Sequence, residues 1–161
     1  MSVQKTNKDR KPGLPLPRRG NEGEALQIRF HNSTAEVSRM TTEELRSNFL
    51  IESVMQADEL KLVYTHYDRM IIGGVMPVNK TIALPTYAPL KSKFFLERRE
   101  IGIINVGGDG EIKVNGKAFD LRKLDSLYVG KGSEKVSFKS KKKDNPAKFY
   151  LLSAPAHHTY A

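Results

Sequence analysis

Hydrophobic and polar positions follow two different spacings along this chain, and the change comes near residue 60. Before it, one segment has a helical spacing, with Leu45 and Phe49 four residues apart on one face. Thr41 followed three residues later by Glu44 matches a capping box, which commonly starts a helix. The spacing therefore predicts one short helix over about 41–49.

After residue 60 the apolar positions form short runs separated by turn residues, as in an all-β protein. The clearest pair is a hairpin with Asn115-Gly116 as its turn, because this dipeptide favours the two positive φ angles of a type I′ turn. The lysine-rich stretch 139–145 is expected to be a second hairpin tip, where its charges stay in solvent. This pattern predicts an antiparallel sandwich or barrel. We expect its strands within 60–74, 82–84, 94–108, 111–121, 126–132, 135–140 and 148–154.

The net charge of +9 comes from two short segments. Residues 1–20 hold six basic residues and one acidic residue, residues 139–148 hold five and one, and the rest of the chain is electroneutral. Such clusters attract nucleic acid by general electrostatics, but these lack interleaved aromatic residues and any base-reading motif. Solvated charge is the better interpretation, so we predict no nucleic-acid partner.

Composition narrows the class of protein further. The 161 residues are 39% hydrophobic, enough for one folded domain, and the absence of cysteine excludes disulfides, thiolate metal sites and a catalytic thiol. No apolar run reaches the roughly 18 residues of a membrane span, and the basic N-terminus lacks the apolar core of a secretory signal. We therefore expect a cytoplasmic protein without membrane contact. Its polar, proline-rich start predicts a disordered basic extension over 1–35, followed by one domain over 36–161.

The segment around Asp125 resembles the second sequence motif of the cupin jelly rolls. Asp125, Val129 and Gly132 fit that motif, whereas Gly130 replaces its proline and Lys135 replaces its metal-binding histidine. The resemblance implies a mostly β fold, an antiparallel cupin-type jelly roll with one short N-terminal helix.

The first cupin motif places two histidines and a glutamate on one strand, with their side chains directed into the barrel. Phe94 and Leu96 occupy the positions of the two histidines, and Ile101 occupies that of the glutamate. Apolar side chains cannot ligate a cation, but they fill a barrel interior well. The sequence therefore predicts a packed core and no metal ion on this chain.

A closer family resemblance extends over about 115 residues, from Arg46 to Tyr160. Its stretches follow the order and spacing of the N-terminal half of 5-keto-4-deoxyuronate isomerase, also called 4-deoxy-L-threo-5-hexosulose-uronate ketol-isomerase. They are NFLIESVMQADE (48–59), YTHYDRMIIGGVMP (64–77), FFLERREIGIINVGGDG (94–110), LYVGKG (127–132) and PAKFYLLSAPAHHTY (146–160).

The resemblance implies an enzyme of pectin and uronate breakdown that converts 4-deoxy-L-threo-5-hexosulose uronate to 3-deoxy-D-glycero-2,5-hexodiulosonate. It also implies a bicupin-like fold, a zinc ion and a homo-oligomer, commonly a hexamer. In a ketol isomerisation a general base moves a proton between adjacent carbons, and a metal can polarise the carbonyl. The family's zinc ligands lie in the C-terminal half, which has no counterpart here, so we expect the isolated chain to be inactive. It should also expose apolar surface and self-associate.

Several histidines invite a functional interpretation. His66 and Asp68 lie two apart and would share one face of a strand, either towards a substrate or simply on a polar outer face. His157 and His158 are adjacent and would point to opposite faces of a strand. They therefore predict a surface or interface role rather than one metal site.

No catalytic residue follows from the sequence, but Arg98 and Arg99 join His66 as candidates for a substrate contact. An arginine pair suits a uronate carboxylate, because guanidinium groups bind carboxylates through paired hydrogen bonds. The alternative is that both arginines form salt bridges with Glu97 and Glu100 at an interface or at the barrel rim. Two other functions stay open: a non-catalytic scaffold or oligomerisation module, and a small sugar-binding module.

Overall fold

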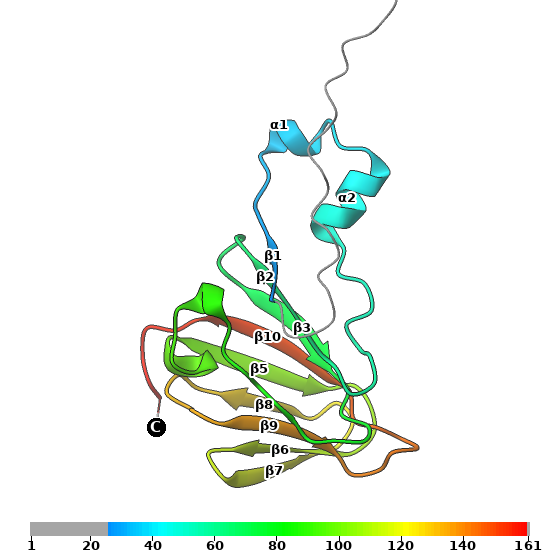
Figure 1. The fold of residues 1–161 in the computed structure, drawn as a ribbon, viewed down its shortest axis with the longest axis vertical. Helices are drawn as coiled ribbons and strands as arrows, with labels where there is room; N and C mark the ends of the chain where they lie inside the picture. Colours follow the sequence, from blue (N-terminus) through cyan, green and yellow to red (C-terminus); the bar gives the residue numbers. More distant parts are fainter. Residues whose placement is uncertain (1–25, 161) are drawn as a thin grey trace, which may run out of the picture.

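The computed structural model describes residues 26–160, which form two facing β-sheets with a helical arm at one end (Figure 1). The larger sheet has the order β1 (Gln27–Arg29), β2 (Leu60–Thr65), β3 (Ile71–Val75), β10 (Phe149–Pro155), β5 (Arg99–Asn105) and β8 (Ser126–Val129). The smaller sheet has the order β4 (Ile82–Ala83), β9 (Val136–Ser140), β6 (Gly110–Val114) and β7 (Lys117–Leu121). The helices are α1 (Thr34–Val37) and α2 (Thr42–Phe49), with short 3₁₀ helices η1 (Ala88–Leu90) and η2 (Phe95–Glu97).

The strand order from β3 to β10 is that of a jelly roll. Strands β3, β10, β5 and β8 lie side by side in one sheet, and β4, β9, β6 and β7 lie side by side in the other. The chain therefore crosses from sheet to sheet at nearly every connection, and the β6–β7 hairpin is the exception. This confirms the prediction of a mostly β, cupin-type jelly roll.

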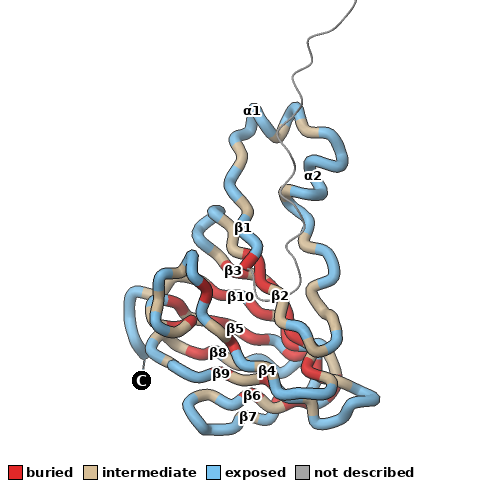
Figure 2. Tube along the Cα trace, in the orientation of Figure 1, coloured by how far each residue is buried: buried red, intermediate tan, exposed pale blue. Residues whose placement is uncertain are grey.

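The core lies between the two sheets, where alternate side chains of the strands meet. Figure 2 shows the buried residues along these strands in red. In β5, Ile101 and Ile103 are buried and point inward, and the residues between them face outward. Phe138 of β9 packs on Phe149 of β10, with ring centroids 5.6 Å apart, so the contact joins the two sheets. Both rings are fully buried, and such burial contributes about 1.5–3 kcal/mol for each side chain.

The predicted hairpin and its turn are confirmed. Asn115 (φ 48°) and Gly116 (φ 90°) adopt the two left-handed conformations of a type I′ turn between β6 and β7. The Asn115 Oδ1 also accepts hydrogen bonds from the backbone amides of Glu134 and Lys135, at 3.0 and 2.9 Å. The turn therefore fixes the start of β9 as well.

Two strand predictions are wrong in part. The strand expected over 94–108 begins only at Arg99, because Phe95 and Leu96 are both buried and a strand cannot direct two consecutive side chains into one core. The 3₁₀ helix η2 places them there instead. The lysine-rich stretch 139–145 is not a hairpin tip, because β9 and β10 belong to different sheets and this segment crosses between them.

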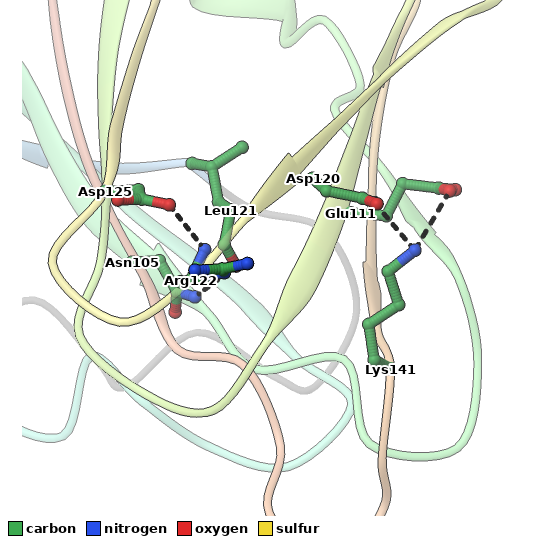
Figure 3. A network of polar contacts seen from close by, with 7 residues as sticks. All are labelled: Asn105, Glu111, Asp120, Leu121, Arg122, Asp125 and Lys141. Carbon is green, nitrogen blue, oxygen red and sulfur yellow. Dashed lines mark hydrogen bonds and ion pairs between the residues drawn. The ribbon is translucent and has the colours of Figure 1, made fainter.

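One lysine of that crossover is paired rather than free in solvent. The Lys141 ammonium lies 2.6 Å from a carboxylate oxygen of Asp120 and 3.6 Å from one of Glu111 (Figure 3). The hydrogen bond that Lys141 donates to Asp120 is the main reason that the pKa of Lys141 is raised. These exposed pairs anchor the crossover to the edge of the smaller sheet, at modest gain in stability.

An arm precedes the barrel and consists of β1, α1 and α2 (residues 27–49). Strand β1 pairs in parallel with β2, and α1 and α2 stand away from the sheets in Figure 1.

The predicted helix and its capping box are confirmed, since the Thr41 Oγ1 accepts from the Glu44 amide and the Glu44 carboxylate accepts from the Thr41 amide. Helix α1 was not predicted, and ordered structure begins before residue 36, the expected domain start. Most of the predicted extension, residues 1–25, lies outside the described residues.

The arm buries little apolar surface. Helix α2 contains no buried residue, and Leu45 and Phe49 are 36% and 47% exposed. Phe30 is 68% exposed, and its ring stacks on the His66 ring at 4.6 Å between centroids. None of the helices within residues 26–160 is long and apolar enough to cross a membrane.

Asn105 ends β5 and is fully buried, yet its side-chain amide is hydrogen-bonded throughout. Its Nδ2 donates to the carbonyls of Gly108 (2.8 Å) and Leu121 (3.0 Å). Its Oδ1 accepts from the amides of Gly107 (3.1 Å) and Lys148 (3.3 Å). One side chain therefore joins the β5–β6 loop, the end of β7 and the segment before β10. Figure 3 shows Asn105 beside Leu121.

We predict that Asn105→Leu lowers the free energy of unfolding by about 2–4 kcal/mol, because four backbone groups lose a buried partner. Urea denaturation followed by circular dichroism measures this loss. The matched control is Asn145→Leu, at an exposed side chain in the β9–β10 crossover, which should change stability by less than about 0.5 kcal/mol. Equal effects of the two substitutions would contradict the role of Asn105.

Asp58 organises the approach to β2 and the loop after β3. Its Oδ1 accepts from the backbone amides of Asn79 (2.7 Å) and Val78 (2.9 Å), and its Oδ2 accepts from the Asn79 side chain at 2.7 Å. These hydrogen bonds, led by that from the Asn79 amide, hold the pKa of Asp58 below its ordinary value. The charged carboxylate is therefore the form that the fold stabilises.

We predict that wild-type stability exceeds that of Asp58→Asn near neutral pH and that the difference shrinks in acid. A lowered pKa gives stability that is complete above the ordinary value of about 3.9 and is lost as pH falls through the folded value. Urea midpoints at about pH 6 and pH 3 test this. A difference between wild type and variant that stays constant over this range would refute it.

Candidate functional site

A buried arginine begins β5 at one end of the barrel. Arg99 is only 7% exposed. Its Nε donates to the Ser153 hydroxyl (3.1 Å), and its Nη2 donates to the carbonyls of Ser153 (2.9 Å) and Arg69 (2.6 Å). Among the described residues no carboxylate pairs with this guanidinium, so a nearly buried cation is held by neutral acceptors alone.

Burial and the neighbouring positive charge of Arg69 make the charged form of Arg99 less favourable than it is in water. The pKa of Arg99 is lowered to about 10, mainly by burial; Tyr64 raises it and the positive charge of Arg69 lowers it. The Arg99 guanidinium carbon lies 5.9 Å from the centre of the Tyr64 ring, which permits a cation–π contact. At neutral pH the group stays protonated and available to an anion.

Arg99 lines a small pocket of about 210 Å³. Arg69 contributes from the β2–β3 turn and Arg98 from the residue before β5, while Tyr64 of β2 and Pro155 of β10 form further walls. The remaining lining residues are Pro89, Leu90, Ser92 and Phe95. The pocket thus has three guanidinium-bearing side chains and no acidic lining residue, an arrangement that suits an anion.

A larger groove of about 490 Å³ adjoins this pocket, and the two share Ser92 and Arg98 as lining residues. The groove is lined by Thr86, Tyr87, Ala88, Lys91, Lys93 and Glu97 besides the shared pair, and its walls combine polar groups with a somewhat larger apolar surface. Hydroxyl, ammonium and carboxylate groups of this kind bind polar ligands through hydrogen bonds.

Of the three candidate residues, the structure brings Arg98 and Arg99 together and leaves His66 outside the pocket. His66 follows β2 and is exposed, and its ring stacks on Phe30 and meets the Tyr64 ring edge-on at 5.3 Å. Asp68 lies in the β2–β3 turn with φ 51°, so it does not share a strand face with His66 as expected.

The alternative interpretation of the arginines as partners in salt bridges is wrong. Arg98 donates to the carbonyls of Leu90 and Lys91, and Arg99 donates as described above. Glu97 accepts from the Lys93 amide at 2.7 Å, and Glu100 accepts from the Tyr128 hydroxyl at 2.9 Å. Both carboxylates are thus engaged elsewhere.

The positions that match the cupin metal ligands do not form a metal site. Leu96 and Ile101 are buried and apolar, Phe94 precedes η2 and is not on a strand, and Lys135 is exposed. Within residues 26–160 no group of three or more His, Asp or Glu side chains is placed to hold a metal ion. His157 and His158 are exposed and follow β10, so the expectation that they lie on a strand is wrong.

Sequence reasoning missed the residues that hold Arg99 in place. Ser153 lies 54 positions away in the chain, and it reaches Arg99 only because β10 pairs with β5. Arg69 is 30 positions away and comes close through the pairing of β3 with β10. Neither separation leaves a local sequence signal.

Comparison with solved structures returns cupins at low similarity. A cupin protein from Bacteroides fragilis matches 57% of this chain and 72% of its own, at 14% identity and a TM-score of 0.41. The EutQ protein of Clostridium difficile matches 55% and 59%, at 19% identity and a TM-score of 0.38. The jelly-roll assignment therefore rests on the strand order, and no family model matches the chain.

Curated relatives are much more similar in sequence, and three bacterial ones are named 4-deoxy-L-threo-5-hexosulose-uronate ketol-isomerase. That of Formosa agariphila is 51% identical over 134 residues, which are 83% of this chain and 48% of the relative. Those of Halalkalibacterium halodurans and Escherichia coli O157:H7 are 47% and 46% identical over 135 and 137 residues, each 84% of this chain and 49% of the relative. The chain is therefore a homologue of the 4-deoxy-L-threo-5-hexosulose-uronate ketol-isomerases and spans about half the length of these relatives.

Proposed function

We propose that this chain provides one jelly-roll half, the N-terminal one, of a 4-deoxy-L-threo-5-hexosulose-uronate ketol-isomerase. The observation that carries the proposal is 44–51% identity over about 84% of the chain to proteins with that name. The substrate would be a 4-deoxy-5-ketouronate from pectin or uronate breakdown, and the absence of cysteine is in keeping with a cytoplasmic location. These relatives favour an isomerase over a non-catalytic scaffold or sugar-binding module.

The resemblance implies a zinc ion, but the residues of this chain do not fit one. Buried Leu96 and Ile101 offer no lone pair, and the exposed Lys135 carries a positive charge. Zinc requires nitrogen, oxygen or sulfur ligands in a converging set. We therefore assign the zinc ligands to the other half of the complete enzyme, and we assign to this chain the packed barrel that supports it.

We predict that the purified chain binds no stoichiometric zinc and shows no ketol-isomerase activity. The physical reason is the apolar filling of the barrel at the positions where ligands would lie. Elemental analysis after dialysis measures the zinc content, and a coupled assay with 4-deoxy-5-ketouronate measures turnover. One tightly bound zinc per chain, or turnover above the uncatalysed rate, would refute the corresponding half of the prediction.

We further propose that the chain forms a homo-oligomer through the arm (residues 27–49). An isolated helix shorter than about 12 residues is marginal in water and gains its stability mainly from packing an apolar face. Helix α2 has eight residues, and its apolar residues Leu45 and Phe49 remain more than one third exposed. A second copy of the chain packed on this face would supply the missing burial.

We predict that Leu45→Glu raises the dissociation constant of the oligomer at least tenfold, because a buried carboxylate would replace an apolar contact. Sedimentation velocity over a range of concentrations measures the constant. Glu43→Gln is the matched control, since Glu43 is an exposed residue in the first turn of the same helix and has no hydrogen bond or ion pair among the described residues. A monomeric wild type, or equal effects of both substitutions, would contradict the proposal.

A further inference from the structure

We propose that the pocket lined by Arg69, Arg98 and Arg99 binds a small oxyanion, the carboxylate or phosphate group of a polar metabolite. The proposal concerns binding to this chain itself. It does not depend on the proposed isomerase activity, because the pocket is complete within the described residues.

Arg99 provides the fixed anchor of this site. Its Nε and Nη2 are occupied by Ser153 and by the Arg69 carbonyl, which hold the guanidinium in one orientation. Its Nη1 makes no hydrogen bond among the described residues and is not among the enclosed atoms without a partner. One nitrogen of a rigidly held guanidinium that lines the pocket thus remains accessible and able to donate without loss of side-chain freedom.

Arg69 adds a second charge at an unusual backbone position. Asp68 (φ 51°) and Arg69 (φ 54°) form a type I′ turn, closed by a hydrogen bond from the Met70 amide to the Tyr67 carbonyl at 3.2 Å. Glycine is strongly favoured at the second central position of this turn. The β6–β7 turn follows that rule with Gly116, whereas the β2–β3 turn carries an arginine there. The turn alone does not explain why an arginine occupies this position. A positive charge on a residue that lines the pocket offers an explanation.

Arg98 completes the cluster. Its Nη2 donates to two backbone carbonyls of the η1 segment, so the side chain is directed towards that wall while its other nitrogens have no partner among the described residues. Three cations in one pocket without an acidic lining residue repel one another. A bound oxyanion would relieve this repulsion and use the open nitrogens.

The adjoining groove indicates what kind of molecule could carry the bound oxyanion. Because Ser92 and Arg98 line both cavities, a molecule with its anionic group in the small pocket would extend between the hydroxyls and charges of the larger one. Polar groups beside apolar surface suit the hydroxyl groups and the C–H faces of a sugar ring. A sugar acid or a sugar phosphate has this combination of groups.

Calorimetric titration of the full chain with D-galacturonate, inorganic phosphate and D-galactose tests the proposal. We expect saturable binding of galacturonate, phosphate or both at one site per chain. Neutral galactose should bind at least tenfold more weakly. Galacturonate alone would identify a carboxylate site, and phosphate alone a phosphate site, and either result supports the oxyanion proposal. No saturable binding of either anion, or equally tight binding of galactose, would overturn it.

Arg69→Gly is the decisive variant, because it removes the charge and gives the turn its favoured residue. We expect anion affinity to fall at least fivefold while the melting temperature stays the same or rises, since the backbone carbonyl that accepts from Arg99 is retained. Arg122→Gln removes one charge in the exposed β7–β8 turn, at the opposite end of β5, and should leave affinity unchanged. Wild-type affinity in Arg69→Gly, or an equal loss in both variants, would refute the site.

Discussion

The pairing of β10 between β3 and β5 is the interaction on which the rest of this structure depends. The strand completes the larger sheet from its centre, with Leu151 opposite both Gly73 and Ile103. It also presents Phe149 to Phe138 of the other sheet, which ties the two layers together. Without β10, β2 and β3 would have no connection to β5 and β8, and the barrel would have no closed core.

Strand β5 directs a buried polar side chain into the barrel at each of its two ends. Its inward-facing row runs from Arg99 through two isoleucines to Asn105, so a buried polar side chain closes the apolar row at each end. Asn105 is satisfied completely by backbone groups and stabilises loops. Arg99 keeps one nitrogen open and sits among other cations. The Asn105 end of β5 therefore stabilises the fold, whereas the Arg99 end has the features of the anion site proposed above.

Local signals in the sequence predicted local structure well. The capping box at Thr41 and the Asn115-Gly116 turn each depend on residues within a few positions of one another, and both are present. The same kind of box at Ser33 was overlooked, because a helix of four residues has no apolar period to draw attention to it. The prediction of a strand from Phe94 is wrong at its start, because the successive apolar residues 95 and 96 form a 3₁₀ turn that buries both side chains.

The contacts within the candidate site could not be predicted from local patterns in the sequence. Arg98 and Arg99 stood out as a charged pair beside an apolar run, but their partners come from β10 and from the β2–β3 turn. Only the sheet register brings these segments together, and a register over such separations depends on the whole fold rather than on any short pattern. The sequence therefore singled out both arginines as candidates but predicted the wrong partners for them.

The central position of β10 also has a consequence for synthesis on the ribosome. Strands β3 and β5 are synthesised before Phe149–Pro155, so the edges that they present to β10 stay unpaired until this last strand of the barrel is available. Pairing over such a distance is slow compared with local hairpins. Translation speed and chaperone access should thus decide the yield of folded protein more than its equilibrium stability does.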